Sequence, residues 1–128
     1  MRLNPDCIRD ILLACEEICT ATNWAIFNKR ENFSIDGKRY YEYDELIYHL
    51  NQCDLNGYFT ESKYSILGEY QVKDITPKAH EFLANIREDT NWNKIKDIAL
   101  KIGSVSLSSL NDIAAKVIAE IIKSQMGI

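Results

Sequence analysis

The sequence predicts a mainly helical α+β fold, and three observations support this prediction. Apolar residues recur every three or four positions in five stretches of the 128-residue chain, as on the buried face of an amphipathic helix. Short apolar runs on either side of Gly68 predict a pair of antiparallel strands between the second and third helices. Hydrophobic residues make up 46% of the chain and charged residues 27%, a globular balance that excludes extensive disorder. We therefore expect a single domain over 1–128, with a core over about 1–90 and a helical extension over about 91–128.

The first helix is expected over about residues 5–19. Asn4 can cap its amino end, and Pro5 occupies the first helical position, where its missing N–H costs nothing. The apolar stripe of this helix leaves four charged residues on the solvent side: Arg9, Asp10, Glu16 and Glu17. Residues 20–43 show no helical period, which predicts irregular structure with short strands, one of them around residues 36–37.

The second helix is expected over about residues 44–56, and Gly57 ends it because glycine readily adopts the left-handed conformation found at helix ends. The inward stripe of this helix is Leu46, Ile47, Leu50 and Cys53. Thr76 and Pro77 repeat the signal of a cap followed by a proline, so they open a third helix. The segment in between, about residues 57–76, therefore predicts a two-stranded antiparallel wing.

The fourth and fifth helices are expected over about residues 91–102 and 107–125. Gly103 ends the fourth helix, and Ser104 or Ser106 caps the fifth. The inward stripe of the fourth helix is Trp92, Ile95, Ala99 and Ile102. The apolar face of the fifth helix is wider than packing against one neighbour requires, which predicts a homodimer in which these helices pair across a two-fold axis. The residues expected at that contact are Leu110, Ile113, Val117, Ile118 and Ile121. The alternative is a helix buried on two sides within one chain.

Cysteine and histidine residues give no signature of a metal centre or a catalytic site. The cysteines stand at four positions: Cys7, Cys15, Cys19 and Cys53. No C-x-x-C pair occurs, although Cys15 and Cys19 share one face of the first helix. His49 and His80 each stand alone on separate segments. We expect buried reduced thiols, no metal, no cofactor and no catalytic residue, so an enzyme is not expected.

Short motifs carry a resemblance to a known fold and to a protein family. Residues 43–50, residues 55–58 and residues 75–83 follow the order of a helix, its glycine stop and the exit from a hairpin. In this order the chain resembles a winged-helix domain, here with two extra C-terminal helices. Further matching segments are Asp6, Ile8-Arg9, Ile11-Leu12, Tyr48-His49-Leu50, His80-Glu81-Phe82-Leu83, Arg87-Glu88-Asp89-Thr90 and Trp92-Asn93-Lys94. On these the chain is similar to a family of uncharacterised small proteins from Gram-positive bacteria, their phages and prophages. The resemblance implies no activity and no catalytic residues.

The charge pattern disagrees with an ordinary DNA-binding surface. The helix over 44–56, which would enter the major groove, contains neither Lys nor Arg, and the formal net charge of the chain is -4. Candidate contacts to bases on its outer face are Tyr48, His49, Asn51 and Gln52. A modest basic patch is expected at Lys94, Lys96 and Lys101, although a solvated helix face is the simpler interpretation. Nucleic acid is therefore a disfavoured partner.

Two functions stay open from the sequence. One is a non-enzymatic winged-helix-like phage or prophage protein that binds another protein, for example a host factor, where an acidic surface can compete for a basic groove. The alternative is a DNA-binding transcriptional regulator. No apolar run reaches the ~18 residues of a membrane span, and charged residues interrupt the region where a signal peptide would have its apolar core. We therefore expect a cytoplasmic protein without membrane association.

Overall fold

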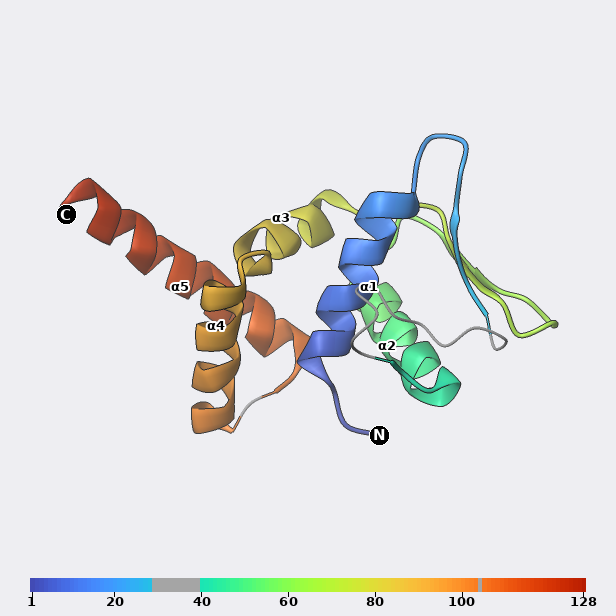
Figure 1. Ribbon diagram of the computed structural model, residues 1–128, viewed down its shortest axis with the longest axis horizontal. Helices are drawn as coiled ribbons and strands as arrows, with labels where there is room; N and C mark the ends of the chain where they lie inside the picture. Colours follow the sequence, from blue (N-terminus) through green and yellow to red (C-terminus); the bar gives the residue numbers. More distant parts are fainter. Residues whose placement is uncertain (29–39, 104) are drawn as a thin grey trace. The chain divides into compact units, whose positions relative to one another are not determined.

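The computed structural model describes residues 1–28, 40–103 and 105–128. Within these ranges, five helices and three strands follow one another (Figure 1). Their bounds are α1 Pro5–Ile18, β1 Ala25–Phe27, α2 Tyr43–Leu55, β2 Ser62–Tyr64, β3 Tyr70–Val72, α3 Pro77–Ile86, α4 Asp89–Ile102 and α5 Leu107–Met126. The mainly helical α+β class is confirmed. The strand expected around residues 36–37 lies outside the described residues.

Capping residues mark the starts and ends of helices close to the predicted positions. The Asn4 side chain accepts a hydrogen bond from the Asp6 N–H at 3.1 Å and thereby caps α1. Ser106 caps α5, since its hydroxyl oxygen accepts the Ser109 N–H at 3.0 Å. The other predicted cap, Ser104, lies outside the described residues. Gly103 ends α4 with a φ of 77°, in the left-handed region that costs glycine little.

The three strands form one antiparallel sheet in the order β1-β3-β2. The hairpin of β2 and β3 confirms the predicted pair of strands, and β1 adds a third strand to the free edge of β3. Ala25 pairs with Val72 and Phe27 pairs with Tyr70, and all four side chains are buried. Ile26, which points to the opposite face, is 52% exposed. One face of the sheet therefore belongs to the core.

The chain divides into two compact units, Met1–His80 and Glu81–Ile128. The division falls within α3, whereas we expected the helical extension to begin near residue 90. In the first unit, α1 and α2 lie side by side (Figure 1), and both bury apolar residues. The buried apolar residues of these two helices are Cys7, Ile8, Ile11, Leu12, Ala14, Cys15, Leu46, Leu50 and Cys53. Among the described residues, no helix combines the length and the apolar character needed to span a bilayer.

His49 joins α2 to the start of α1. Its side chain is 1% exposed, and its Nε2 accepts the Asn4 N–H at 2.7 Å. Because Nε2 is an acceptor, the proton of the neutral ring belongs on Nδ1, which donates to the Glu45 carbonyl oxygen at 2.7 Å. The Glu45 carboxylate also accepts from the Asn4 side-chain amide at 3.0 Å. Asn4, which caps α1, thus donates hydrogen bonds to α2 from both its backbone N–H and its side-chain amide.

The expectation that Arg9 and Asp10 face the solvent is wrong. Arg9 is 6% exposed and Asp10 is 2% exposed. The Tyr41 hydroxyl donates to Asp10 Oδ2 at 2.6 Å, and Tyr41 is itself buried. Helical spacing identifies the apolar stripe of α1, but it cannot show that a residue far along the chain covers the polar side. Glu16 and Glu17 are exposed, as expected.

Replacing Tyr41 by phenylalanine should destabilise the protein. The substitution leaves the buried Asp10 carboxylate one donor short, which costs about 1–3 kcal/mol of unfolding free energy. Urea unfolding followed by circular dichroism measures this loss. Tyr40→Phe is the matched control because Tyr40 is 64% exposed. Equal stability of the two variants would contradict a stabilising role for the Tyr41 hydrogen bond.

The pH dependence of stability should report the burial of His49. Desolvation lowers the pKa of His49 below its ordinary value, and the Glu45 carbonyl only partly opposes this effect. Below a pH of about 6.5, the unfolded chain therefore binds a proton that the folded chain refuses, so the free energy of unfolding falls. The contribution of His49 to this decrease in the free energy of unfolding ends once the pH is below the folded-state pKa of His49.

Urea unfolding at a series of pH values between about 7.5 and 5 tests this expectation. His49→Gln should lose less stability over this range than the unmodified protein, whatever its absolute stability. His80→Gln is the control because His80 is exposed. An unchanged pH slope in His49→Gln would show that His49 does not resist protonation in the fold.

Candidate functional site

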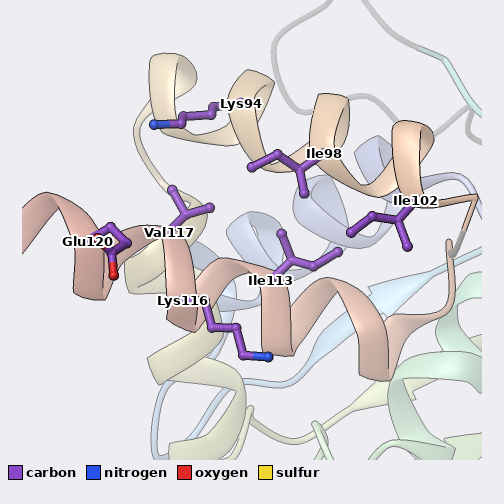
Figure 2. Close-up of a pocket in the computed structure, with 7 residues that line it drawn as sticks. All are labelled: Lys94, Ile98, Ile102, Ile113, Lys116, Val117 and Glu120. Carbon is purple, nitrogen blue, oxygen red and sulfur yellow. The ribbon is translucent and has the colours of Figure 1, made fainter.

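An open apolar groove lies between α4 and α5, entirely within the second unit (Figure 2). Its volume is about 350 Å³. The residues that line it are Lys94, Ile98 and Ile102 from α4 and Ile113, Lys116, Val117 and Glu120 from α5. Figure 2 shows the isoleucines of α4 facing Ile113 and Val117 across the space between the two helices. The groove therefore has apolar walls and charged residues beside them.

The spacing of residues on each helix produces these walls. Lys94, Ile98 and Ile102 are four residues apart, so their side chains form one row along α4. Ile113 and Val117 form the corresponding row on α5. The core stripe of α4 is a different row, with Trp92, Ile95 and Ala99 buried. The apolar surface of α4 is thus wider than the part that the core covers.

Ile102 belongs to this uncovered part of α4. We expected it in the inward stripe, and that expectation is wrong because its side chain is 64% exposed. Ile102 follows Ile98 by four residues and Ala99 by three residues. Either spacing places two side chains on the same face of a helix. Spacing alone could not distinguish these two rows, since each satisfies a helical period.

The charges beside the groove are unbalanced. Glu120 forms an ion pair with Lys123 at 3.6 Å, where both side chains are largely exposed. Lys94 and Lys116 have no ion-pair partner within the described part of the chain. Two ammonium groups next to apolar walls therefore favour an anionic, amphipathic ligand.

The residues predicted for a homodimer contact divide into two groups. Leu110 is 0% exposed and Val117 is 7% exposed, so both pack within the chain. Ile113, Ile118 and Ile121 are half-buried. The apolar face of α5 is thus partly used inside one chain, as the alternative of intramolecular burial required. A homodimer stays a prediction, and its contact would have to use the half-buried residues.

The expected basic patch does not form one surface. At 100° per residue, Lys94 and Lys101 lie about 20° apart around α4, whereas Lys96 lies about 160° from Lys94. Lys101 forms an ion pair with Asp97 at 2.9 Å. The Lys96 ammonium lies 5.4 Å from the centre of the Trp92 ring, which attracts it. The prediction of a three-lysine patch is therefore corrected to one lysine at the groove and two with other contacts.

The four predicted base contacts of α2 are also not equivalent. His49 is buried, so the expectation that it contacts a base is wrong. Tyr48 and Gln52 are half-buried and Asn51 is exposed, and these three share one side of the helix. Tyr48 packs edge-on against His49, with ring centres 4.9 Å apart. The three accessible residues form a small polar face that contains no cation. The first turn of the same helix carries Asp44 and Glu45.

The hairpin between β2 and β3 carries an exposed apolar tip that we did not predict. Ile66 is fully exposed and Leu67 is 82% exposed. The Gly68 N–H donates to the Ser65 carbonyl at 3.0 Å and Ser65 N–H donates to the Glu69 carbonyl at 2.8 Å, which closes a tight turn under these two residues. Two adjacent aliphatic residues directly before a turn glycine are the sequence signal for such a tip.

The thiols lie mostly where the sequence predicts them. Cys7, Cys15 and Cys53 are buried, as expected of small apolar side chains, whereas Cys19 is half-buried. Within the described ranges, no group of three histidine, cysteine, aspartate or glutamate residues is placed to hold a metal ion. His80 is exposed.

Comparisons with known proteins identify the family but add no activity. A protein of Haemophilus influenzae, which carries the name "Uncharacterized protein", is 30% identical over 125 residues. The match covers 95% of this chain and 99% of the relative. No solved structure matches the chain. Residues 2–106, which include α1 to α4, match the family described as hypothetical protein (DUF2513), and the chain therefore belongs to this family.

Proposed function

We propose that this DUF2513 protein acts without catalysis, by binding an amphipathic helix of another protein in the groove between α4 and α5. The observation that carries the proposal is the apolar groove itself, with Ile98 and Ile102 on one wall and Ile113 and Val117 on the other. Surfaces of this kind on small proteins commonly serve as interaction sites, because leaving them in water is unfavourable. Ile102 at 64% exposure is the side chain that gains most from being covered.

The shape and the charges of the groove define its occupant. Two helices in contact leave a channel along their shared side, and a third helix fits it by inserting side chains at three- and four-residue spacing. Lys94 and Lys116 favour carboxylates beside the apolar residues of that helix. The proposed partner therefore presents an amphipathic helix with leucine-like residues flanked by Glu or Asp.

A winged-helix-like architecture for Met1–His80 is part of the same proposal. Its support is the element order α1, β1, α2, β2, β3. This is the order of a helix, a short strand, a second helix and a two-stranded hairpin, on which the resemblance to a winged-helix domain rests. The assignment to a phage or prophage protein acting on a host factor rests on the sequence resemblance alone.

The alternative, a DNA-binding regulator, has weaker support. Its recognition helix would be α2, whose accessible polar residues are Tyr48, Asn51 and Gln52 and whose charged residues are all acidic. The cations of the hairpin already have contacts: Lys63 lies 5.3 Å from the centre of the Trp24 ring, and Lys73 lies 3.9 Å from Glu61. Few charges remain to neutralise phosphates, which normally dominate DNA affinity.

Binding of designed peptides tests the groove. Two fluorescein-labelled helical peptides of about five turns share one leucine face and differ only in their flanks, Glu in one and Lys in the other. Fluorescence anisotropy should show tighter binding of the Glu peptide. Ile102→Glu should weaken this binding at least about tenfold, because it places a carboxylate on the apolar wall.

Matched substitutions make this test specific. Leu100→Glu is the control for Ile102→Glu, since Leu100 is 70% exposed on α4 but does not line the groove. Lys94→Gln should weaken the Glu peptide about two- to fivefold, and Lys101→Gln should not. Equal effects of both glutamate substitutions would overturn the proposal. Self-association in sedimentation equilibrium that Ile102→Glu abolishes would instead assign the groove to a second copy of the chain.

A mobility-shift assay separates the two functions. With mixed-sequence duplex DNA at low salt, where non-specific electrostatic binding is strongest, we expect no retardation at protein concentrations that saturate the Glu peptide. Retardation that Asn51→Ala or Gln52→Ala weakens would favour the DNA-binding alternative. The variant Ile102→Glu serves as the control here, because Ile102 lies on α4 and not on the face of α2 that would contact DNA.

A further inference from the structure

The C-terminal half of α5 presents apolar side chains to solvent. This half of the helix continues past α4 (Figure 1), and every side chain from residue 119 to residue 128 except Ile121 is exposed. Ile122 is 52% exposed and Met126 is 68% exposed, although both side chains are large and apolar. Soluble proteins tend to cover apolar surface of this kind with another molecule.

These side chains belong to a row of their own on the helix. Ile118, Ile122 and Met126 follow one another at four-residue spacing, so they form one line along α5, which we call the α5 row. At 100° per residue, Ile122 lies about 180° around the helix from Ile113, which lines the groove. The α5 row therefore lies on the opposite side of α5 from the groove.

The sizes of the side chains on this side of α5 make it complementary to itself. Ala115 and Ala119 stand beside the α5 row and are exposed. Two antiparallel α5 helices can be centred between Ile118 and Ala119, so that these two residues face each other across the copies. Ile122 of one copy then lies opposite Ala115 of the other. In this register each isoleucine meets an alanine, which lets the two helices approach closely.

The charges beside the α5 row favour the same antiparallel pairing. Asp112 and Lys123 are exposed and lie about 20° apart around the helix, three turns from each other, on one flank of the row. In the register above, Asp112 of one copy lies within about two residues, or about 3 Å along the axis, of the level of Lys123 of the other. A parallel pair would bring like charges together instead. The ion pair of Lys123 with Glu120 is exposed and therefore contributes little, so it does not prevent this contact.

We propose that two copies of the chain form a homodimer by pairing their α5 rows antiparallel across a two-fold axis. Such an interface uses the same patch on both copies, which requires a surface that is complementary to itself in size and charge. Of the residues that the sequence analysis predicts for a dimer contact, only Ile118 belongs to this row; the new contact residues are Ile122 and Met126. Because the groove lies on the other side of α5, each copy in the dimer keeps its groove open.

Sedimentation equilibrium of the full chain over about 5–500 μM tests the dimer. Ile122→Glu should raise the dissociation constant at least about tenfold, because it places two carboxylates in the apolar contact. Ile102→Glu is the matched control, since Ile102 is a similarly exposed isoleucine on α4, and it should leave the dissociation constant unchanged. Melting curves verify that both variants are folded. A monomer throughout this range, or a dimer that Ile122→Glu weakens no more than Ile102→Glu does, would overturn the proposal.

Exchange of the two flanking charges tests the direction of pairing. Asp112→Lys and Lys123→Asp each place like charges at both ends of the antiparallel pair, so each should raise the dissociation constant about two- to fivefold. The double variant restores opposite charges and should return the constant to within about twofold of the unmodified protein. A double variant that dimerises as weakly as either single variant would overturn the antiparallel pairing. Ile122→Glu should still bind the Glu peptide, so this proposal and the proposed function of the groove can fail independently.

Discussion

The hydrogen bonds around Asn4 are the constraint on which the first unit depends. Asn4 caps α1 with its side-chain oxygen, gives its backbone N–H to His49 and gives its side-chain amide to Glu45. One residue therefore begins α1 and fixes it against α2. Because His49 is buried between a donor and an acceptor, its ring must be neutral and in one tautomer. The register of the two helices, and hence the apolar core that they share, follows from this arrangement.

A second polar contact covers the polar side of α1. Asp10 and Tyr41 are both buried and are joined by a short hydrogen bond. Burying a carboxylate is unfavourable unless donors satisfy it, so this contact specifies where the chain before α2 must lie. The first unit is thus organised by polar groups at defined positions as well as by apolar area.

The two units offer different surfaces for function. The first unit presents a polar, cation-free face on α2 and an aliphatic hairpin tip at Ile66 and Leu67. The second presents an apolar groove with uncompensated lysines. The proposed recognition by the groove requires only that a partner bring apolar residues and carboxylates.

Local sequence signals determined most of the secondary structure. Asn4 and Pro5, Gly57, Thr76 and Pro77, and Gly103 act through backbone geometry and short-range hydrogen bonds, which operate within a few residues. The apolar runs around Gly68 likewise predicted the hairpin. The acidic character of α2 was readable from composition, and it is the reason for treating nucleic acid as a disfavoured partner.

Only the tertiary structure decided which residues on these elements are accessible. His49, Arg9 and Asp10 are polar residues that distant partners bury, while Ile102 is an apolar residue that its neighbours leave exposed. Helical spacing gives the angle of a side chain around its own axis, but it does not say which other element faces that angle. The groove depends on such a pairing, because residues of both α4 and α5 line it. For this reason the sequence by itself determined the elements and their ends, and the packing of those elements determined the candidate sites.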